Sequence, residues 1–142
     1  MYRKLQQLNE GAISDETETL KSLNALLYAT NLLTAYEGLA IAKKAGIKPD
    51  VFIDAINASS GQSYITKTLL SCDKQKTKYG MDSTISSIYT SFSSTVEIAR
   101  LEAVPLMFTS LTQEIFAMAI NQGLSADSNE CMSDFIEETI GV

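Results

Sequence analysis

Histidine is absent from this sequence, and cysteine occurs only twice, as Cys72 and Cys131. Without histidine the chain has no general base of that kind, no zinc site of the Cys/His type, and no Ser-His-Asp or Cys-His nucleophile. Two isolated cysteines indicate reduced thiols in a cytosolic protein, and a single disulfide between them is the alternative. Catalysis that depends on histidine is therefore excluded.

Basic residues are also few. The chain has 11 of them against 17 acidic residues, which gives a net charge of −6, and the nearest approach to a cluster is Lys74, Lys76 and Lys78. A surface that binds nucleic acid or an anionic membrane carries a denser basic patch. The charge pattern therefore predicts no nucleic-acid partner and no membrane partner.

Long apolar runs and glycine-rich turns are missing as well. The N-terminus has no apolar stretch behind its charges, and no segment approaches the roughly 20 apolar residues of a membrane helix. Neither a GxGxxG turn nor a P-loop occurs, so the chain lacks the usual glycine turn that recognises a dinucleotide. We expect a soluble, cytoplasmic protein that binds no cofactor by itself.

The composition that is present is typical of a globular protein. The chain has 142 residues, of which 45% are hydrophobic and 20% charged, and this suits one domain with its own core. No segment alternates apolar and polar residues for long enough to predict a strand. We predict an all-α domain over residues 14–142, preceded by residues 1–13 as a leader or the remnant of a strand and linker.

One long central helix is predicted from the start of this domain to Ala45. Ser14 or Asp15 can cap its N-terminus, and Gly46 follows where a left-handed C-cap belongs. Its apolar residues lie on more than one side, at Leu20, Leu23, Leu26, Leu27, Leu32, Leu33, Leu39 and Ile41. A surface helix needs only one apolar stripe. We therefore expect this helix to be mostly buried, either at the centre of the domain or between two subunits.

Shorter helices follow in the rest of the chain. Pro49 suits the first position of the second helix, and Pro105 is expected to end one helix and begin the next. The predicted ranges are 49–58, 62–72, 83–104, 105–122 and 127–140, with a polar loop at 73–82. The spacing of apolar residues predicts core faces formed by Val51, Phe52, Ile53, Ala55, Ile56, Ile85, Ile88, Phe92, Val96, Ala99, Leu106, Phe108, Leu111, Ile115, Met118, Ala119, Met132, Phe135 and Ile136.

A polar line crosses the apolar central helix. Lys21, Asn24, Tyr28 and Asn31 are three, four and three residues apart, so they share one face over three turns. In one interpretation the line borders a cleft, where Lys21 binds a carboxylate or gives a proton to a carbonyl and Asn24 orients the same ligand. In the other, Lys21 is a solvated residue of the first turn and the asparagines bridge neighbouring helices.

Two further patterns carry weaker signals. The joint between two helices at 59–63 (SSGQS) offers backbone N–H groups at a helix N-terminus, where an anion can bind, although most joints of this kind only cap helices. Glu97, Glu102 and Glu114 lack the paired spacing of acid–base catalysts or metal ligands, so we interpret them as solvated and expect no metal site.

Five segments of the sequence resemble a known family in their order and spacing. They are 21–24 (KSLN), 36–47 (YEGLAIAKKAGI), 59–64 (SSGQSY), 99–106 (ARLEAVPL) and 121–128 (NQGLSADS). Together they are similar to the C-terminal helical domain of 3-hydroxyisobutyrate dehydrogenase-like enzymes, the β-hydroxyacid dehydrogenase family. The similarity extends over roughly residues 11–142.

The resemblance implies a fold like the C-terminal domain of 6-phosphogluconate dehydrogenase, built around one long helix. In this family an N-terminal Rossmann domain, which we expect to be absent from these 142 residues, holds NAD or NADP, and the helical domain closes over the substrate and forms the dimer. The resemblance places Lys21 at the catalytic acid/base lysine and Asn24 in the lysine-x-x-asparagine-asparagine pattern. With the polar line, this predicts Asn24 and Tyr28 as substrate-binding residues and a homodimer formed through the long helix.

The sequence departs from the family pattern at several functional positions. The catalytic asparagine four residues after the lysine is replaced by Ala25, the glycines before it by Asp15 and Thr17, and a later lysine-aspartate pair by Thr90 and Ser91. Two interpretations remain. The chain is the helical part of an NAD(P)-dependent dehydrogenase for a small hydroxy acid and is inactive as an isolated chain, or it is a free-standing, non-catalytic dimerisation or interaction module.

Overall fold

The computed structural model describes residues 15–68, 83–128 and 131–141. Over these residues the chain is helical, and the β contact found there is an isolated antiparallel bridge between Thr84 and Ser128. The all-α fold predicted from the sequence is confirmed. The predicted leader, residues 1–13, and the predicted loop, residues 73–82, lie outside the described residues.

The long central helix is α2 (Asp15–Lys44), whose 30 residues span about 45 Å. At its C-terminus the Ile47 N–H donates to the Ala42 carbonyl and the Gly46 N–H donates to the Lys43 carbonyl, each at 2.9 Å. Gly46 has a φ of 78°, the left-handed conformation that completes this type of C-cap. The helix therefore ends within one residue of the position that the sequence predicts.

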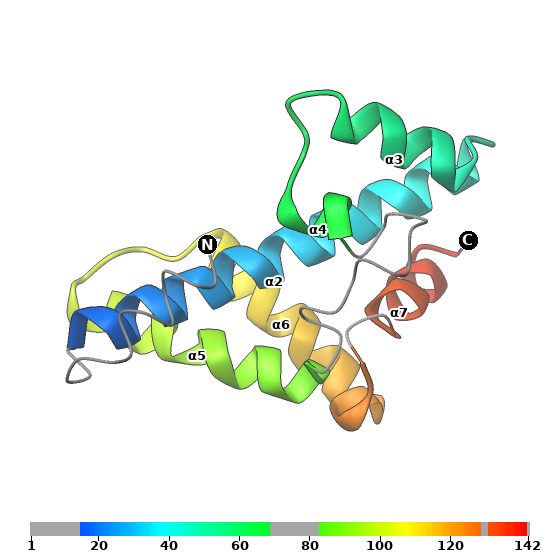
Figure 1. Cartoon of the computed structure of the whole chain (residues 1–142). Helices are drawn as coiled ribbons and strands as arrows, with labels where there is room; N and C mark the ends of the chain where they lie inside the picture. The colour runs from blue at the N-terminus through cyan, green and yellow to red at the C-terminus, as the bar shows by residue number, and fades with distance from the viewer. Residues whose placement is uncertain (1–14, 69–82, 129–130, 142) are drawn as a thin grey trace.

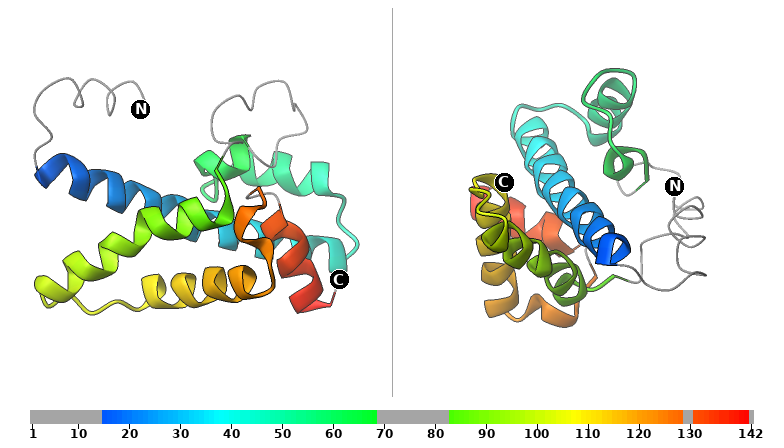
Figure 2. Two further views of the ribbon diagram at one scale, coloured as in Figure 1. Left: turned by 90° about the horizontal axis from the view of Figure 1, so that it is seen from below. Right: turned by 90° about the vertical axis from the view of Figure 1, so that its left-hand side faces the viewer.

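The other helices pack around α2 (Figures 1 and 2). They are α3 (Pro49–Asn57), α4 (Tyr64–Thr68), α5 (Ile85–Leu101), α6 (Phe108–Asn121) and α7 (Cys131–Ile140), with a 3₁₀ turn, η2 (Leu124–Ala126), before α7. The α2 helix lies between α3 and α4 on one side and α5, α6 and α7 on the other. The α5 helix accompanies its N-terminal part, and α7 lies beside its C-terminal part.

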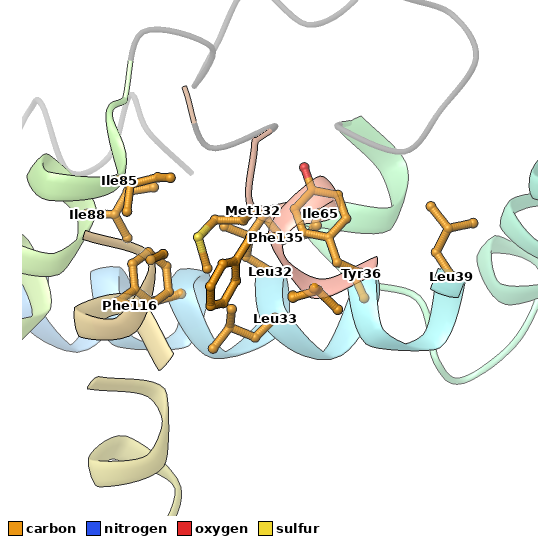
Figure 3. Close-up of a cluster of buried hydrophobic side chains, with 14 of the residues drawn as sticks. Leu32, Leu33, Tyr36, Leu39, Ile65, Ile85, Ile88, Phe116, Met132 and Phe135 are labelled. Carbon is orange, nitrogen blue, oxygen red and sulfur yellow. The ribbon is translucent and has the colours of Figure 1, made fainter. Parts of the chain in front are cut away.

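The apolar core forms where the C-terminal two thirds of α2 meet α5, α6 and α7 (Figure 3). Leu32 of α2, Phe116 of α6 and Met132 of α7 are fully buried there, and Ile65 of α4 belongs to the same cluster. Phe92 of α5 meets Phe116 edge to face, with ring centres 5.4 Å apart. Aromatic rings favour this arrangement, so the core joins α2, α4, α5, α6 and α7.

Two lysines at the end of α2 connect it to α7. Lys43 forms an ion pair with Glu137, and the Lys44 ammonium donates to the carbonyls of Ile140 and Gly141, each at 3.2 Å. The last carbonyls of a helix have no partner within the helix. At the C-terminus of α7 the lysine ammonium bonds to these carbonyls and interacts favourably with the negative end of the helix dipole. The C-terminal helix is thus held by charge as well as by its apolar face.

The expectation that α2 is mostly buried is correct for only part of the helix. Leu32, Leu33 and Leu39 are buried. Leu20, Leu23, Leu27 and Ile41 are instead exposed by 50%, 40%, 64% and 59%. Before Ala25, α2 buries Thr17 and Ser22, so this part of the helix turns hydroxyl-bearing residues inward and exposes Leu20 and Leu23, whereas Leu26 and Ala29 pack in the core.

The boundary between α5 and α6 also differs from the prediction. The α5 helix ends at Leu101 rather than Val104, and α6 begins at Phe108 rather than Pro105. Ala103 has a φ of 54°, and the Val104 N–H reaches back to the Ala99 carbonyl at 2.8 Å. This left-handed C-cap stops α5 before Pro105 can do so.

The α6 helix buries only part of the predicted face: Ala119 is buried and Ile115 packs against the core, but other predicted residues are exposed. Its buried residues are Thr109, Thr112, Phe116 and Ala119. Phe108, Leu111 and Met118, which the spacing predicted in the core, are exposed by 74%, 60% and 48%, and Val51 of α3 is exposed by 55%. The Thr112 hydroxyl lies 3.4 Å from the Thr30 hydroxyl on α2, so threonines form the contact that the apolar pattern assigned to leucines.

Candidate functional site

Lys21 lies on the second turn of α2, and its side chain is 37% exposed. Its ammonium donates a hydrogen bond to the Glu18 carboxylate at 3.0 Å, one turn earlier in the same helix. Exposed ion pairs of this kind contribute about 0.2–1 kcal/mol to stability. The contribution of the Lys21–Glu18 pair to stability is therefore small.

The polar line divides into a solvated part and a packed part. Asn24 and Asn31 are exposed, and neither amide side chain forms a hydrogen bond with any residue that the structure describes. Tyr28 is half-buried, and its ring lies 6.4 Å from that of Tyr64 at an angle of 50°. The asparagine side chains thus do not bridge neighbouring helices in the described part of the chain, and Lys21, on the second turn, is partly exposed beside Glu18.

Tyr64 is the residue of this region that the sequence did not single out. It begins α4 and is 48% exposed. Its ring lies beside the ring of Tyr28, which belongs to the polar line. Nothing in the sequence spacing links a residue of α4 to the central helix, because the contact arises only when the chain returns to α2. The one sequence feature that could have drawn attention to Tyr64 is its position in the family-like segment SSGQSY.

The joint at 59–63 serves as a helix cap. The Ser63 N–H donates to Thr66 Oγ1 at 2.9 Å and the Thr66 N–H donates to Ser63 Oγ at 3.2 Å. This reciprocal pair satisfies the first N–H groups of α4. The helix covers only residues 64–68 of the predicted 62–72, and residues 69–72 lie outside the described part of the chain.

The positions that depart from the family pattern have clear local roles. Ala25 is half-buried and packs against the apolar core, where an asparagine amide would have to find new partners. Thr90 and Ser91 are exposed on α5, and their hydroxyls donate to the carbonyls of Ser86 and Ser87 at 2.9 and 2.7 Å. Neither position supplies a charge to a ligand.

An open groove lies away from the polar line. It is bounded by α2, α6 and α7, has a volume of about 120 Å³, and is lined by Leu33, Glu37, Ile115, Met118, Phe135, Ile136, Thr139 and Ile140. Its lining is apolar apart from one carboxylate and one hydroxyl. This lining offers no acid–base pair for chemistry.

Two kinds of site matter for the described residues: a metal site and a dinucleotide-binding turn. No group of three or more histidine, cysteine, aspartate or glutamate side chains among them could hold a metal. The described residues also contain no strand-to-helix glycine turn of the kind that cradles a dinucleotide. None of the described helices is long and apolar enough to cross a membrane. Fold and site define an all-α domain whose candidate site lies near the exposed start of one long helix.

Residues 16–135 match the family model described as NAD-binding of NADP-dependent 3-hydroxyisobutyrate dehydrogenase, and the chain belongs to this family. Its fold is similar to the crystal structure of 3-hydroxyisobutyrate dehydrogenase from Salmonella typhimurium, with a TM-score of 0.71 and 22% identity. The similarity covers 82% of this chain and 41% of that one, so this chain spans less than half of that protein. No curated protein matches the chain. The family resemblance found in the five sequence segments is confirmed.

Proposed function

We propose that this chain is the substrate-closing helical domain of an NAD(P)-dependent dehydrogenase for a small hydroxy acid. In this proposal Lys21 exchanges a proton with the hydroxyl or carbonyl oxygen of the substrate. The observation that supports it is the place of Lys21: an accessible cation, at the start of the long helix, in a domain of the 3-hydroxyisobutyrate dehydrogenase family. Asn24 and Tyr28 lie on the same face of the helix, after Lys21.

The proposed chemistry uses groups that lie on one face of α2. The Lys21 ammonium has three donors, and it pairs with the exposed Glu18 carboxylate 3.0 Å away. Asn24 lies nearly one turn further along α2 and can donate or accept a hydrogen bond at the substrate carboxylate. Tyr28, beside Tyr64, would border the other end of the substrate. General acid catalysis by a positioned side chain contributes about 10²–10⁴-fold to a rate.

The nicotinamide cofactor would have to be held largely by another domain. The family description names NAD binding, but the described residues do not fit a dinucleotide by themselves, since they include no glycine-rich phosphate turn. We propose that this chain alone is inactive and that NAD or NADP, which accepts the hydride, binds to a Rossmann domain that closes against it. Cytoplasmic localisation and a homodimer through the long helix remain predictions.

The first test is the gene sequence upstream of Met1. An adjoining Rossmann sequence supports the dehydrogenase, and the protein that includes it should then oxidise a small 3-hydroxy acid with NAD⁺ or NADP⁺. In that protein Lys21→Met should lower kcat by about 10²–10⁴-fold, whereas Lys67→Met, at an exposed lysine of α4, should leave it unchanged. Equal activity of the two variants would contradict the role of Lys21.

The chain by itself provides the second test. Titration with NADH, NADPH and 3-hydroxyisobutyrate should show no saturable binding of either dinucleotide. Saturable binding of NADH or NADPH would show that the described helices form a cofactor site. The proposal that a separate Rossmann domain holds the cofactor would then be wrong.

A second candidate function is a non-catalytic dimerisation or interaction module derived from the same family. Ala25 favours it, because the residue that replaces the family's catalytic asparagine packs against the core. An independent stop codon and promoter upstream of Met1, together with no oxidation of 3-hydroxy acids, would support this candidate over the dehydrogenase.

A further inference from the structure

The apolar core stops short of one end of the molecule. We call this end the arm: residues 15–24 of α2, 93–101 of α5, and 102–112, which connect α5 to α6 and begin α6. In Figures 1 and 2 α2 and α5 extend together at this end, beyond α3, α4 and α7. The core cluster and the side chains packed against it reach Ala25 on α2, Phe92 on α5 and Ile115 on α6, and among the described residues they have no member in the arm.

Small and polar side chains fill the inside of the arm, while most of its large apolar side chains are exposed. The buried residues are Thr17, Ser22, Thr95, Ala99, Thr109 and Thr112. The large apolar residues that are exposed, by 40–77%, are Leu20, Leu23, Leu101, Val104, Met107, Phe108 and Leu111. A folded region gains stability mainly from the apolar surface that it removes from water. The arm therefore gains much less from its packing than the core does.

The hydroxyl groups inside the arm do not make up for this difference. The Ser22 and Ser94 hydroxyls meet at 2.6 Å between α2 and α5. The Thr95 hydroxyl, one residue further along α5, is buried and has no hydrogen-bond partner among the described residues. An unpaired buried hydroxyl costs about as much free energy as one hydrogen bond between hydroxyls contributes, so these two terms largely cancel.

The ion pairs of Lys21 and Arg100 do not join the two helices of the arm either. Lys21 pairs with Glu18 at 3.0 Å within α2, and Arg100 pairs with Glu97 at 3.5 Å within α5. Beyond the arm, by contrast, the Phe92 and Phe116 rings meet edge to face between α5 and α6, with centres 5.4 Å apart. The aromatic contact between these two rings marks where strong packing begins.

We propose that the arm opens as a unit while the core stays folded, and that this opening withdraws Lys21 from its place on α2. Segments with few buried apolar contacts open at a lower cost in free energy than the core of the same protein. The boundary crosses the polar line of α2, because Lys21 and Asn24 lie on the arm whereas Tyr28 packs against the core. Only the closed arm presents all three residues on one helix face.

The opening gives the candidate site a way to respond to its ligand. A substrate that reaches from Lys21 to Tyr28 bridges the arm and the core, and it binds only the closed state. A ligand that prefers one state shifts the population toward that state, so such a substrate closes the arm. This last step rests on the proposed function, whereas the opening of the arm itself does not.

The test is amide hydrogen exchange of the full chain in a series of low urea concentrations, at one protein concentration. The amides of residues 19–24 and 96–101 should exchange at least about tenfold faster than those of residues 29–40. Their exchange should also respond less to urea, because urea promotes each opening in proportion to the surface that the opening exposes. Residues 15–18 are left out since the first four N–H groups of a helix have no acceptor within it.

A substitution in the core separates local opening from global unfolding. Ile65→Val removes one methylene from a fully buried residue of the core cluster and should speed exchange at residues 29–40 by about 2–10-fold. Exchange at 19–24 and 96–101 should stay unchanged, because the core remains folded when the arm opens. Equal acceleration of both sets, or equal rates in the wild type, would show that the arm opens only when the whole chain unfolds and would overturn the proposal.

A substitution in the arm tests the cause of the opening. Thr95→Val replaces the unpaired hydroxyl by a methyl group and should slow exchange at 19–24 and 96–101 several-fold. Thr139→Val is the same change on α7, at a hydroxyl that donates to the Phe135 carbonyl at 2.7 Å, and should leave exchange of the arm as in the wild type. Arm exchange that Thr95→Val does not slow would overturn the assignment of the opening to the polar interior.

The link to the substrate is measured in the protein that includes a Rossmann domain. There 3-hydroxyisobutyrate should slow exchange at 19–24, and exchange at 29–40 should change less. Absence of this slowing would overturn the closing of the arm by substrate. It would not affect the opening measured in the chain alone, where neither cofactor nor substrate is present.

Discussion

Lys43 near the end of α2 and Glu137 in α7 form an ion pair across 94 residues of sequence. Their side chains are only 34% and 20% exposed, and Glu137 also accepts a hydrogen bond from Ser133 at 3.2 Å. Removing one partner of a half-buried pair leaves the other charge poorly solvated. The pair therefore fixes how the C-terminal helix lies on the central one.

Glu137→Ala should lower the free energy of unfolding by about 1–3 kcal/mol. Urea denaturation followed by circular dichroism measures this change. Glu97→Ala is the matched control, because the Arg100–Glu97 pair is 76% and 62% exposed and should contribute less than about 1 kcal/mol. Equal losses in the two variants would show that burial of the Lys43 pair has no effect.

Thr95→Val should stabilise the protein by about 1 kcal/mol. The Thr95 hydroxyl is buried and finds no hydrogen-bond partner among the described residues, and an unpaired buried hydroxyl costs free energy that a methyl group of the same shape does not. Thr66→Val is the control at a buried threonine whose hydroxyl accepts from the Ser63 N–H at 2.9 Å and should destabilise by about 1–3 kcal/mol. Thermal unfolding of both variants decides the sign; destabilisation by Thr95→Val would show that its hydroxyl is bonded.

Ala103→Gly should raise stability by about 0.5–1 kcal/mol. Ala103 has a φ of 54°, a conformation that costs an L-residue roughly 1–2 kcal/mol and glycine little, and the gain is reduced by the greater freedom of glycine in the unfolded chain. Ala58→Gly is the control, since Ala58 has a φ of −87° and should lose stability. Denaturation midpoints at one protein concentration compare the two; a loss in both would place Ala103 in an unstrained conformation.

Lys21→Met should change the free energy of unfolding by less than about 0.5 kcal/mol. The lysine is 37% exposed and pairs with Glu18 at 3.0 Å, and exposed pairs at i,i+3 contribute a few tenths of a kcal/mol. Phe92→Ala, at a fully buried ring, should lose about 3–5 kcal/mol in the same denaturation experiment. A large loss from Lys21→Met would mean that the lysine supports the fold rather than a ligand.

Local features of the chain were predictable from the sequence. The end of α2 at Gly46, the start of α3 at Pro49 and the stop of α6 before Gly123 follow from the conformations that glycine and proline favour. The common face of Lys21, Asn24 and Tyr28 follows from the helical period alone. These properties depend on neighbours a few residues apart, and the sequence contains them directly.

Which helix faces are buried was decided by the tertiary structure. In α6 the threonines at 109 and 112 occupy the buried face while Phe108 and Leu111 lie outside. The spacing of apolar residues could not reveal that threonines are buried. A threonine hydroxyl can form a hydrogen bond within its own helix or with a neighbouring helix, and the side chain can then pack as a small buried group. The outward leucines of α2 escaped prediction for the same reason.

The candidate site shows the same division between local pattern and long-range contact. The sequence by itself determined an all-α chain with a long helix and a lysine near its start, because caps, helical period and family motifs are local. Only the tertiary structure decided that Lys21 is exposed beside Glu18, that Ala25 packs against the core and that Tyr64 meets Tyr28. Burial and ring contacts depend on residues brought together from distant parts of the chain, and no spacing along one helix specifies them.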